Sequence, residues 1–159
     1  MSGHGAAERT HIDAKGLRVV IIAGTWHEVI SDGLIAGAVR QLDASGATYS
    51  LVRVPGSVGL PVAAEAALEA GADAVVALGV ISRGGTPHFE FVSAAATDGL
   101  TRVALDTGKP VGFGVLTLDD EAQGIDRAGF PDSAEDKGGE SAHAAIATAL
   151  VLRVLRAGA

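Results

Sequence analysis

Short apolar blocks alternate along the chain with longer stretches in which apolar residues recur every three or four positions. The blocks predict four β-strands, at residues 17–23, 49–54, 75–81 and 109–117. Most of the blocks are rich in Val, Ile and Leu and nearly free of charge, which is typical of strands buried on both faces of a parallel sheet. We therefore expect the sheet to lie at the centre of the protein.

The stretches between the blocks predict helices that cover this sheet. Ile30, Leu34, Ala38 and Leu42 recur at intervals of four, so they share one face of a helix. Further helices are expected after residues 61, 87, 119 and 136, each opened by a proline or an acidic residue. Strands that alternate with helices through right-handed crossovers give an α/β fold, a three-layer αβα sandwich of the flavodoxin-like type with a four-stranded parallel sheet.

Composition narrows the class of protein. A chain of 159 residues with 48% hydrophobic residues is long enough for one packed domain. Residues 1–14 contain charges and no apolar core of a signal peptide, so we expect a flexible arm there and a single domain over residues 15–159. No stretch reaches the roughly 18 apolar residues of a membrane span, which predicts a soluble protein without a membrane partner.

Charge and cysteine usage exclude several kinds of site. The net charge of −7 argues against nucleic acid as a partner, because phosphate backbones are bound by clustered Lys and Arg. The chain has no Cys, which fits a reducing cytoplasm, and its five His are scattered without metal-ligand spacing, so no metal is expected. Neither a dinucleotide-binding fingerprint nor a P-loop is present, and no cofactor is expected.

The richest candidate chemistry follows the third predicted strand, at residues 82–90. Gly84 and Gly85 allow a tight turn, Thr86 is a suitable N-cap, and a proline follows at the first helical position. The unpaired N–H groups at such a helix start can bind phosphate, and Arg83 would add a full positive charge. His88 lies in the first turn, where it could transfer protons near neutral pH. The alternative is that these residues form an ordinary loop.

Other residues at the ends of predicted strands point to the same edge of the sheet. Trp26, the only tryptophan, follows the first strand, where open α/β sheets bind ligands. It could stack on a ligand ring or fill the core. His27 is interpreted as a solvated residue at the start of a helix.

Five ordered motifs together resemble the 6,7-dimethyl-8-ribityllumazine synthase family. They are Val54-Pro-Gly, Leu78-Gly-Val-Ile-Ser-Arg-Gly-Gly-Thr-Pro-His-Phe-Glu90, Gly112-Phe-Gly-Val-Leu-Thr117, Asp126-Arg-Ala-Gly129 and Glu135-Asp-Lys-Gly138. The similarity runs from about residue 17 to residue 153. It implies a cofactor-free condensation of 5-amino-6-(D-ribitylamino)uracil with 3,4-dihydroxy-2-butanone 4-phosphate, in which an imine forms, phosphate is eliminated and the ring closes. The product would be 6,7-dimethyl-8-ribityllumazine, an intermediate of riboflavin biosynthesis.

The resemblance also implies roles for individual residues. His88 would be the catalytic proton-transfer residue, and Phe113 would come from a neighbouring subunit of a homopentamer, which in some relatives is part of an icosahedral shell. The substrate-binding set is Trp26, Ser57, Val58, Gly59, Val80, Ile81, Ser82 and Phe113. The phosphate-binding set adds Gly85, Thr86, Arg127 and Lys137 to Arg83.

The sequence departs from the family pattern in one loop. The usual Pro-Gly-Ser/Ala-Phe-Glu-Ile/Leu-Pro reads Pro-Gly-Ser-Val-Gly-Leu-Pro here, so Val58 and Gly59 replace an aromatic residue and a carboxylate. Ser82 stands where isoleucine is usual. The departures keep two alternatives open: a relative that binds a flavin or lumazine without making it, and a shell-forming scaffold.

Overall fold

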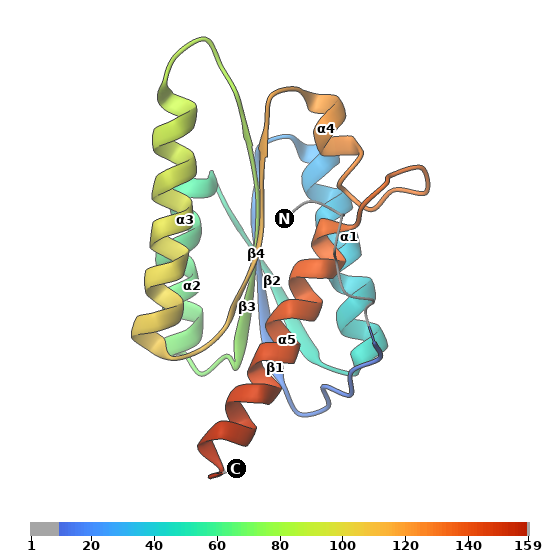
Figure 1. Cartoon of the computed structure of the whole chain (residues 1–159), viewed down its shortest axis with the longest axis vertical. Helices are drawn as coiled ribbons and strands as arrows, with labels where there is room; N and C mark the ends of the chain where they lie inside the picture. Colours follow the sequence, from blue (N-terminus) through green and yellow to red (C-terminus); the bar gives the residue numbers. More distant parts are fainter. Residues whose placement is uncertain (1–9, 159) are drawn as a thin grey trace.

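The computed structural model describes residues 10–158, and within that range four parallel strands form one sheet with helices on both faces (Figure 1). The strands are β1 (Arg18–Gly24), β2 (Thr48–Val54), β3 (Ala74–Ser82) and β4 (Val111–Leu118). Their order across the sheet is β2-β1-β3-β4, and every neighbouring pair is parallel. This confirms the predicted flavodoxin-like sandwich.

Helices pack in two layers. One face carries α2 (Leu60–Glu69) and α3 (His88–Thr107), and the other carries α1 (Glu28–Ser45), α4 (Glu121–Ile125) and α5 (Lys137–Arg156) (Figure 1). A short 3₁₀ turn, η1 (Ser57–Gly59), precedes α2 and was not predicted. The two helices approach closely at Gly99 of α3, where a Cβ would lie only 2.6 Å from Pro61 Cγ of α2.

The core consists of two apolar clusters separated by the sheet. Leu34 and Ile146 are fully buried in the cluster under α1 and α5, whereas Leu60 and Leu100 are buried under α2 and α3. The inner strand β3 is buried from Ala74 to Ile81, as its uninterrupted apolar sequence predicts. In contrast, β2 is one of the two edge strands and its residues are mostly exposed.

The helices begin close to the predicted positions, but α3 starts differently from the expectation. Asp136 caps α5 by accepting a hydrogen bond from the Gly139 N–H at 2.9 Å, and Gly46 follows α1 in the left-handed conformation with φ 71°. The expectation that Thr86 caps α3 was wrong. Pro87 has ψ near 3°, outside the helical range, so the turn continues for one more residue and α3 begins at His88 without a side-chain cap.

The start of the described chain packs against the domain. Ile12 and Ala14 contact the core cluster, and the Ala14 N–H donates to the Ser45 carbonyl at 2.7 Å. The predicted arm at residues 1–14 lies mostly outside the described residues, which begin at residue 10. Among the helices of residues 10–158, none has the length and apolar character needed to cross a membrane.

Candidate active site

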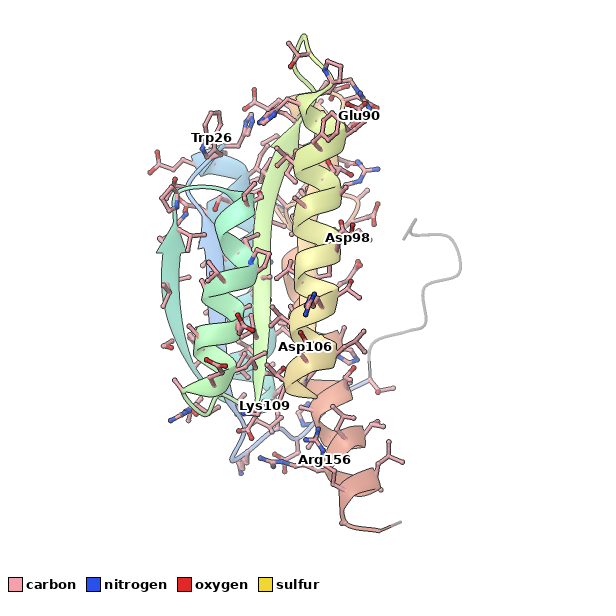
Figure 2. All side chains as sticks on the ribbon, turned by 90° about the vertical axis from the view of Figure 1, so that its left-hand side faces the viewer. Trp26, Glu90, Asp98, Asp106, Lys109 and Arg156 are labelled. Atoms are coloured by element: carbon pink, nitrogen blue, oxygen red, sulfur yellow. The ribbon has the colours of Figure 1, made fainter. Side chains whose placement is uncertain are left out.

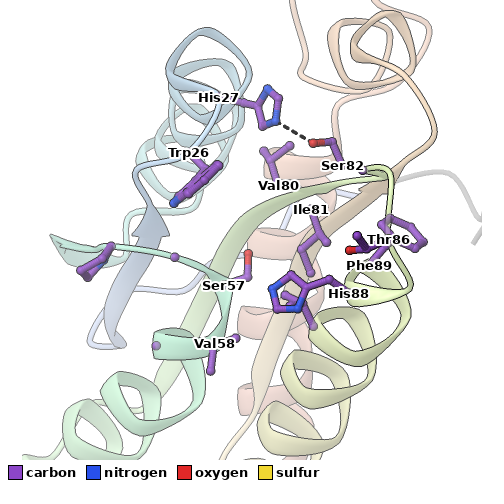
Figure 3. A pocket seen from close by; sticks show the side chains of 15 residues that line it. Trp26, His27, Ser57, Val58, Val80, Ile81, Ser82, Thr86, His88 and Phe89 are labelled. Carbon is purple, nitrogen blue, oxygen red and sulfur yellow. Dashed lines mark hydrogen bonds between the residues drawn. The ribbon is translucent and has the colours of Figure 1, made fainter.

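A pocket of about 550 Å³ opens at the carboxyl ends of β1, β2 and β3 (Figure 3). Three loops and the first turn of α3 form its walls. Figure 2 shows Trp26 at the same end of the molecule as Glu90, while Lys109 and Arg156 lie at the opposite end. The lining residues are Trp26, His27, Pro55, Gly56, Ser57, Val58, Gly59, Val80, Ile81, Ser82, Gly84, Thr86, His88, Phe89 and Val92.

Trp26 forms one wall, on the loop between β1 and α1. Its side chain is 68% exposed, which excludes the interpretation that it fills the core. A Cβ on Gly56 would lie 3.7 Å from the Trp26 Nε1, so the indole lies beside the loop that follows β2. An exposed indole at the edge of an apolar pocket is suited to stacking on a flat ring.

The turn η1 forms the wall contributed by the loop after β2. Ser57 is buried, and its hydroxyl lies against β3 at Gly79, where a Cβ would come within 2.7 Å of Ser57 Oγ. Val58 is exposed on the pocket side. Gly59 has φ −79° and ψ −13°, a conformation open to any residue, so its lack of a side chain is not required by the backbone.

The end of β3 supplies the floor and leads into the start of α3. Val80 and Ile81 are almost completely buried, and Ser82 is exposed beside them. His88 projects from the first turn of α3 toward the side of the pocket that Ser57 lines (Figure 3). The His88 imidazole therefore lies opposite the Trp26 wall.

Arg83 is predicted to bind phosphate, but its guanidinium is engaged by two carboxylates. Nε donates to Asp119 at 2.8 Å and Nη1 to Glu90 at 2.5 Å, while the group lies 4.2 Å above the Phe89 ring centroid. These hydrogen bonds, Asp119 first, raise the pKa of Arg83, and Arg83 lowers the pKa of Glu90. Arg83 does not line the pocket; neither does Gly85, although Gly84 and Thr86 on either side of it do.

Phe113 lies apart from the pocket, on β4. It is 46% exposed and lines a separate groove against α3, together with Leu100 and Leu105.

Arg127 and Lys137 are also outside the pocket, between α4 and the start of α5. Arg127 donates to the Gln123 carbonyl at 2.9 Å and lies 3.8 Å from Glu135, and Lys137 pairs with Glu135 and Glu140. Burial alone would lower the pKa of Lys137, but the hydrogen bonds to Glu135 and Glu140 outweigh it and raise that pKa.

No Lys, Arg, Asp or Glu is among the described residues that line the pocket. Its polar groups are hydroxyls, backbone N–H groups and two imidazoles. Within one chain the pocket can therefore hold a flat, largely apolar ring and move a proton at His88, but it offers a phosphate dianion no guanidinium or ammonium group.

Comparison with known proteins gives the family. The sequence matches the 6,7-dimethyl-8-ribityllumazine synthase family over residues 16–153. The chain belongs to this family. It is 78% identical to the 6,7-dimethyl-8-ribityllumazine synthase of Leifsonia xyli subsp. xyli, with 96% of this chain and 95% of the relative covered. The enzyme of the same name from Clavibacter sepedonicus is 67% identical, with 98% and 99% covered.

The lumazine synthase match spans every residue that lines the pocket. Sequence reasoning assigned most of them, but it placed His27 in solvent and gave Phe89 no role. His27 lines the pocket and its Nε2 lies 2.9 Å from Ser82 Oγ. The signal in the sequence that could have indicated this was position. Residue 27 follows the end of the first strand, and the neighbouring parallel strands end at the same edge of the sheet.

Proposed function

We propose that the pocket is the site at which 5-amino-6-(D-ribitylamino)uracil and 3,4-dihydroxy-2-butanone 4-phosphate condense to 6,7-dimethyl-8-ribityllumazine. A chain of the lumazine synthase family is a transferase of riboflavin biosynthesis. The observation that carries this proposal is the pairing of Trp26 and His88 on two walls of one apolar pocket, in a chain of the lumazine synthase family. The cytoplasm is the compartment we propose for it.

Different walls of the pocket bind the pyrimidine ring and the ribityl chain of the aminouracil. Trp26 stacks on the pyrimidine ring, and Val80 and Ile81 contact its other side. The ribityl chain runs along Ser57, Val58 and Gly59, with Ser82 nearby.

His88 moves the protons of the reaction. The aromatic amine of the uracil attacks the ketone carbonyl to form an imine and water. Loss of a proton and of the phosphate group from the butanone carbons follows and leaves a new ketone carbonyl. The second amine of the uracil attacks this carbonyl, and loss of a second water closes the ring. The proposal assigns the taking and returning of these protons to the His88 imidazole, and general acid–base catalysis of this kind is worth roughly 10²–10⁴-fold in rate.

The phosphate requires cationic groups that the pocket of one chain does not contain. We propose that Thr86 and the Gly85 N–H contact the phosphate and that Arg127 and Lys137 of a neighbouring subunit complete the site. Phe113 would close the ring-binding side from the same neighbour.

Apolar surface outside the pocket supports such an assembly. Leu51 and Val52 on the edge strand are each 46% exposed, Phe91 on α3 is 72% exposed, and Leu155 on α5 is 62% exposed. Exposed apolar residues on an unpaired edge and on two helices mark surfaces that other chains cover. We propose a homopentamer, which could assemble further into a shell.

The proposed reaction can be tested by mixing the purified protein with both substrates. Lumazine fluorescence and released phosphate should rise together, and both should be lost in His88→Ala. Copurifying fluorescence without turnover would instead indicate a flavin- or lumazine-binding relative.

Shared sites can be tested by coexpressing two inactive variants, His88→Ala and Arg127→Ala. If each site combines His88 of one chain with Arg127 of the next, random mixing restores about a quarter of the sites. Sites within single chains would stay inactive in every mixture. Sedimentation of the same samples measures the assembly, and a mass equal to one chain would reject the pentamer.

A further inference from the structure

His27 holds an unusual backbone conformation at the edge of the pocket. With φ 53° and ψ 64° it is left-handed, and among residues 10–158 it is the only non-glycine residue with positive φ. This region is unfavourable for a residue with a side chain, although His, Asn and Asp enter it more often than others. Such a conformation persists where surrounding contacts impose it.

The side chain of His27 forms a hydrogen bond with the end of another strand and does not cap its own helix. His27 occupies the N-cap position of α1, yet its side chain makes no capping hydrogen bond. Its Nε2 lies 2.9 Å from the Ser82 hydroxyl at the end of β3, as Figure 3 shows beside Val80. The bond therefore joins the loop after β1 to the end of β3, 55 residues further along the sequence.

The residue before Trp26 is anchored separately. The Thr25 N–H donates to the Val54 carbonyl at 3.1 Å, and Thr25 Oγ1 donates to the Pro55 carbonyl at 3.0 Å. Trp26 thus lies between a residue tied to the end of β2 and a residue tied to the end of β3. Because the indole is largely exposed, its direction depends on the backbone on both sides more than on packing beneath it.

We infer that His27 and Ser82 form a positioning pair that fixes the Trp26 indole at the pocket for stacking on a flat ring. The pair acts on Trp26 and not on the reacting atoms. Its loss should weaken binding of the aminouracil while the chemical step is preserved. That the stacked ring belongs to the aminouracil rests on the proposed function. The restraint of the Trp26 side chain by the His27–Ser82 pair does not.

Trp26 is the only tryptophan of the chain, so its fluorescence anisotropy decay reports this loop alone. Ser82→Ala and His27→Asn each remove the hydrogen bond between residues 27 and 82. Because asparagine tolerates the left-handed conformation, His27→Asn allows the backbone at residue 27 to keep its conformation. We expect both variants to show wider and faster indole motion in the absence of substrate. Ser82→Thr should retain the native decay, and Ser50→Ala, an exposed hydroxyl on β2, is the matched control.

Kinetics then separate positioning from direct substrate contact. We expect KM for the aminouracil to rise about two- to tenfold in each single variant, because this corresponds to the loss of one hydrogen bond. kcat should change by less than about twofold. The double variant should resemble either single variant, because both changes remove the same bond.

Two results would overturn the inference. Unchanged anisotropy in folded Ser82→Ala would mean that the bond does not restrain Trp26. Additive increases in KM in the double variant would mean that His27 and Ser82 contact the substrate independently. The anisotropy measurement needs no turnover, so it remains decisive even if the proposed condensation is not observed.

Discussion

Replacing Gly59 with glutamate tests the loop where this chain differs most from its family pattern. Gly59 lines the pocket at the start of α2 with φ −79°, and a Cβ there would meet only Val54 Cβ at 3.5 Å and Cγ2 at 3.8 Å. Both are ordinary van der Waals distances, so a side chain fits without moving the backbone. A carboxylate beside the first turn of a helix is also electrostatically favourable.

The expected gain in affinity follows from two opposing contributions. A hydrogen bond between a ribityl hydroxyl and a carboxylate is worth about 1.5–3 kcal/mol, and ordering a glutamate side chain costs about 1.5 kcal/mol. The difference, up to about 1.5 kcal/mol, corresponds to a KM for the aminouracil lowered by as much as about tenfold. kcat should change less, because the contact is made in the ground state and the transition state alike.

Steady-state kinetics with the aminouracil varied at saturating butanone phosphate measure this effect. Gly59→Gln has nearly the same size without the charge and should give a smaller gain. Gly59→Ala reports the backbone contribution alone, and it should leave KM unchanged while raising Tm by about 2–4 °C, because alanine restricts the unfolded chain. An unchanged or higher KM in a well-folded Gly59→Glu variant would show that the ribityl chain does not run past residue 59.

Three further substitutions test the remaining assignments. His88→Ala should lower kcat by about 10²–10⁴-fold while binding of the butanone phosphate, measured by calorimetry, stays largely intact; full activity would reject a role in proton transfer. Arg127→Ala should weaken inorganic phosphate binding by about 1.5–3 kcal/mol, and Arg102→Ala, which removes an exposed guanidinium from α3, is the control expected to have no effect. Arg83→Ala should raise the pKa of Glu90 toward its ordinary value in an NMR titration, since Arg83 is the main cause of its lowered pKa. The lowered pKa also means that this interaction stabilises the fold near neutral pH and is lost as the pH falls through the folded pKa of Glu90.

The sheet and its layers could be predicted from the sequence because strand and helix periodicity are local. Residues 75–81 contain no charged side chain, and the inner strand β3 is buried accordingly. The same reasoning did not reveal that Leu51 and Val52 are exposed, because position in the sheet, not composition, makes β2 an edge strand. An exposed apolar edge strand is a surface that another chain could cover, as the proposed assembly requires.

The sequence predicts the parts of the site that lie at strand ends. It does not predict the contacts between residues that are distant in sequence. Every parallel strand ends at the same edge, so Trp26 and His88 could be placed near each other. The bond between His27 and Ser82 joins the loop after β1 to the end of β3, and no local pattern in the sequence signals it. Arg83 was assigned to phosphate by proximity, but Asp119, 36 residues further along, and Glu90 engage its guanidinium.

If the proposed assembly forms, the distribution of charge around the pocket links phosphate binding to it. The described lining residues include no full cation, whereas Arg127 and Lys137, outside the pocket, are each held beside Glu135. A cationic side chain that is already oriented by a carboxylate loses less conformational entropy when it binds a substrate phosphate in the pocket of a neighbouring subunit. If those residues complete the neighbouring site, an isolated subunit should bind the aminouracil ring through Trp26 but bind phosphate poorly. Dilution to the point of dissociation should therefore weaken phosphate binding before it weakens quenching of Trp26 fluorescence by the aminouracil.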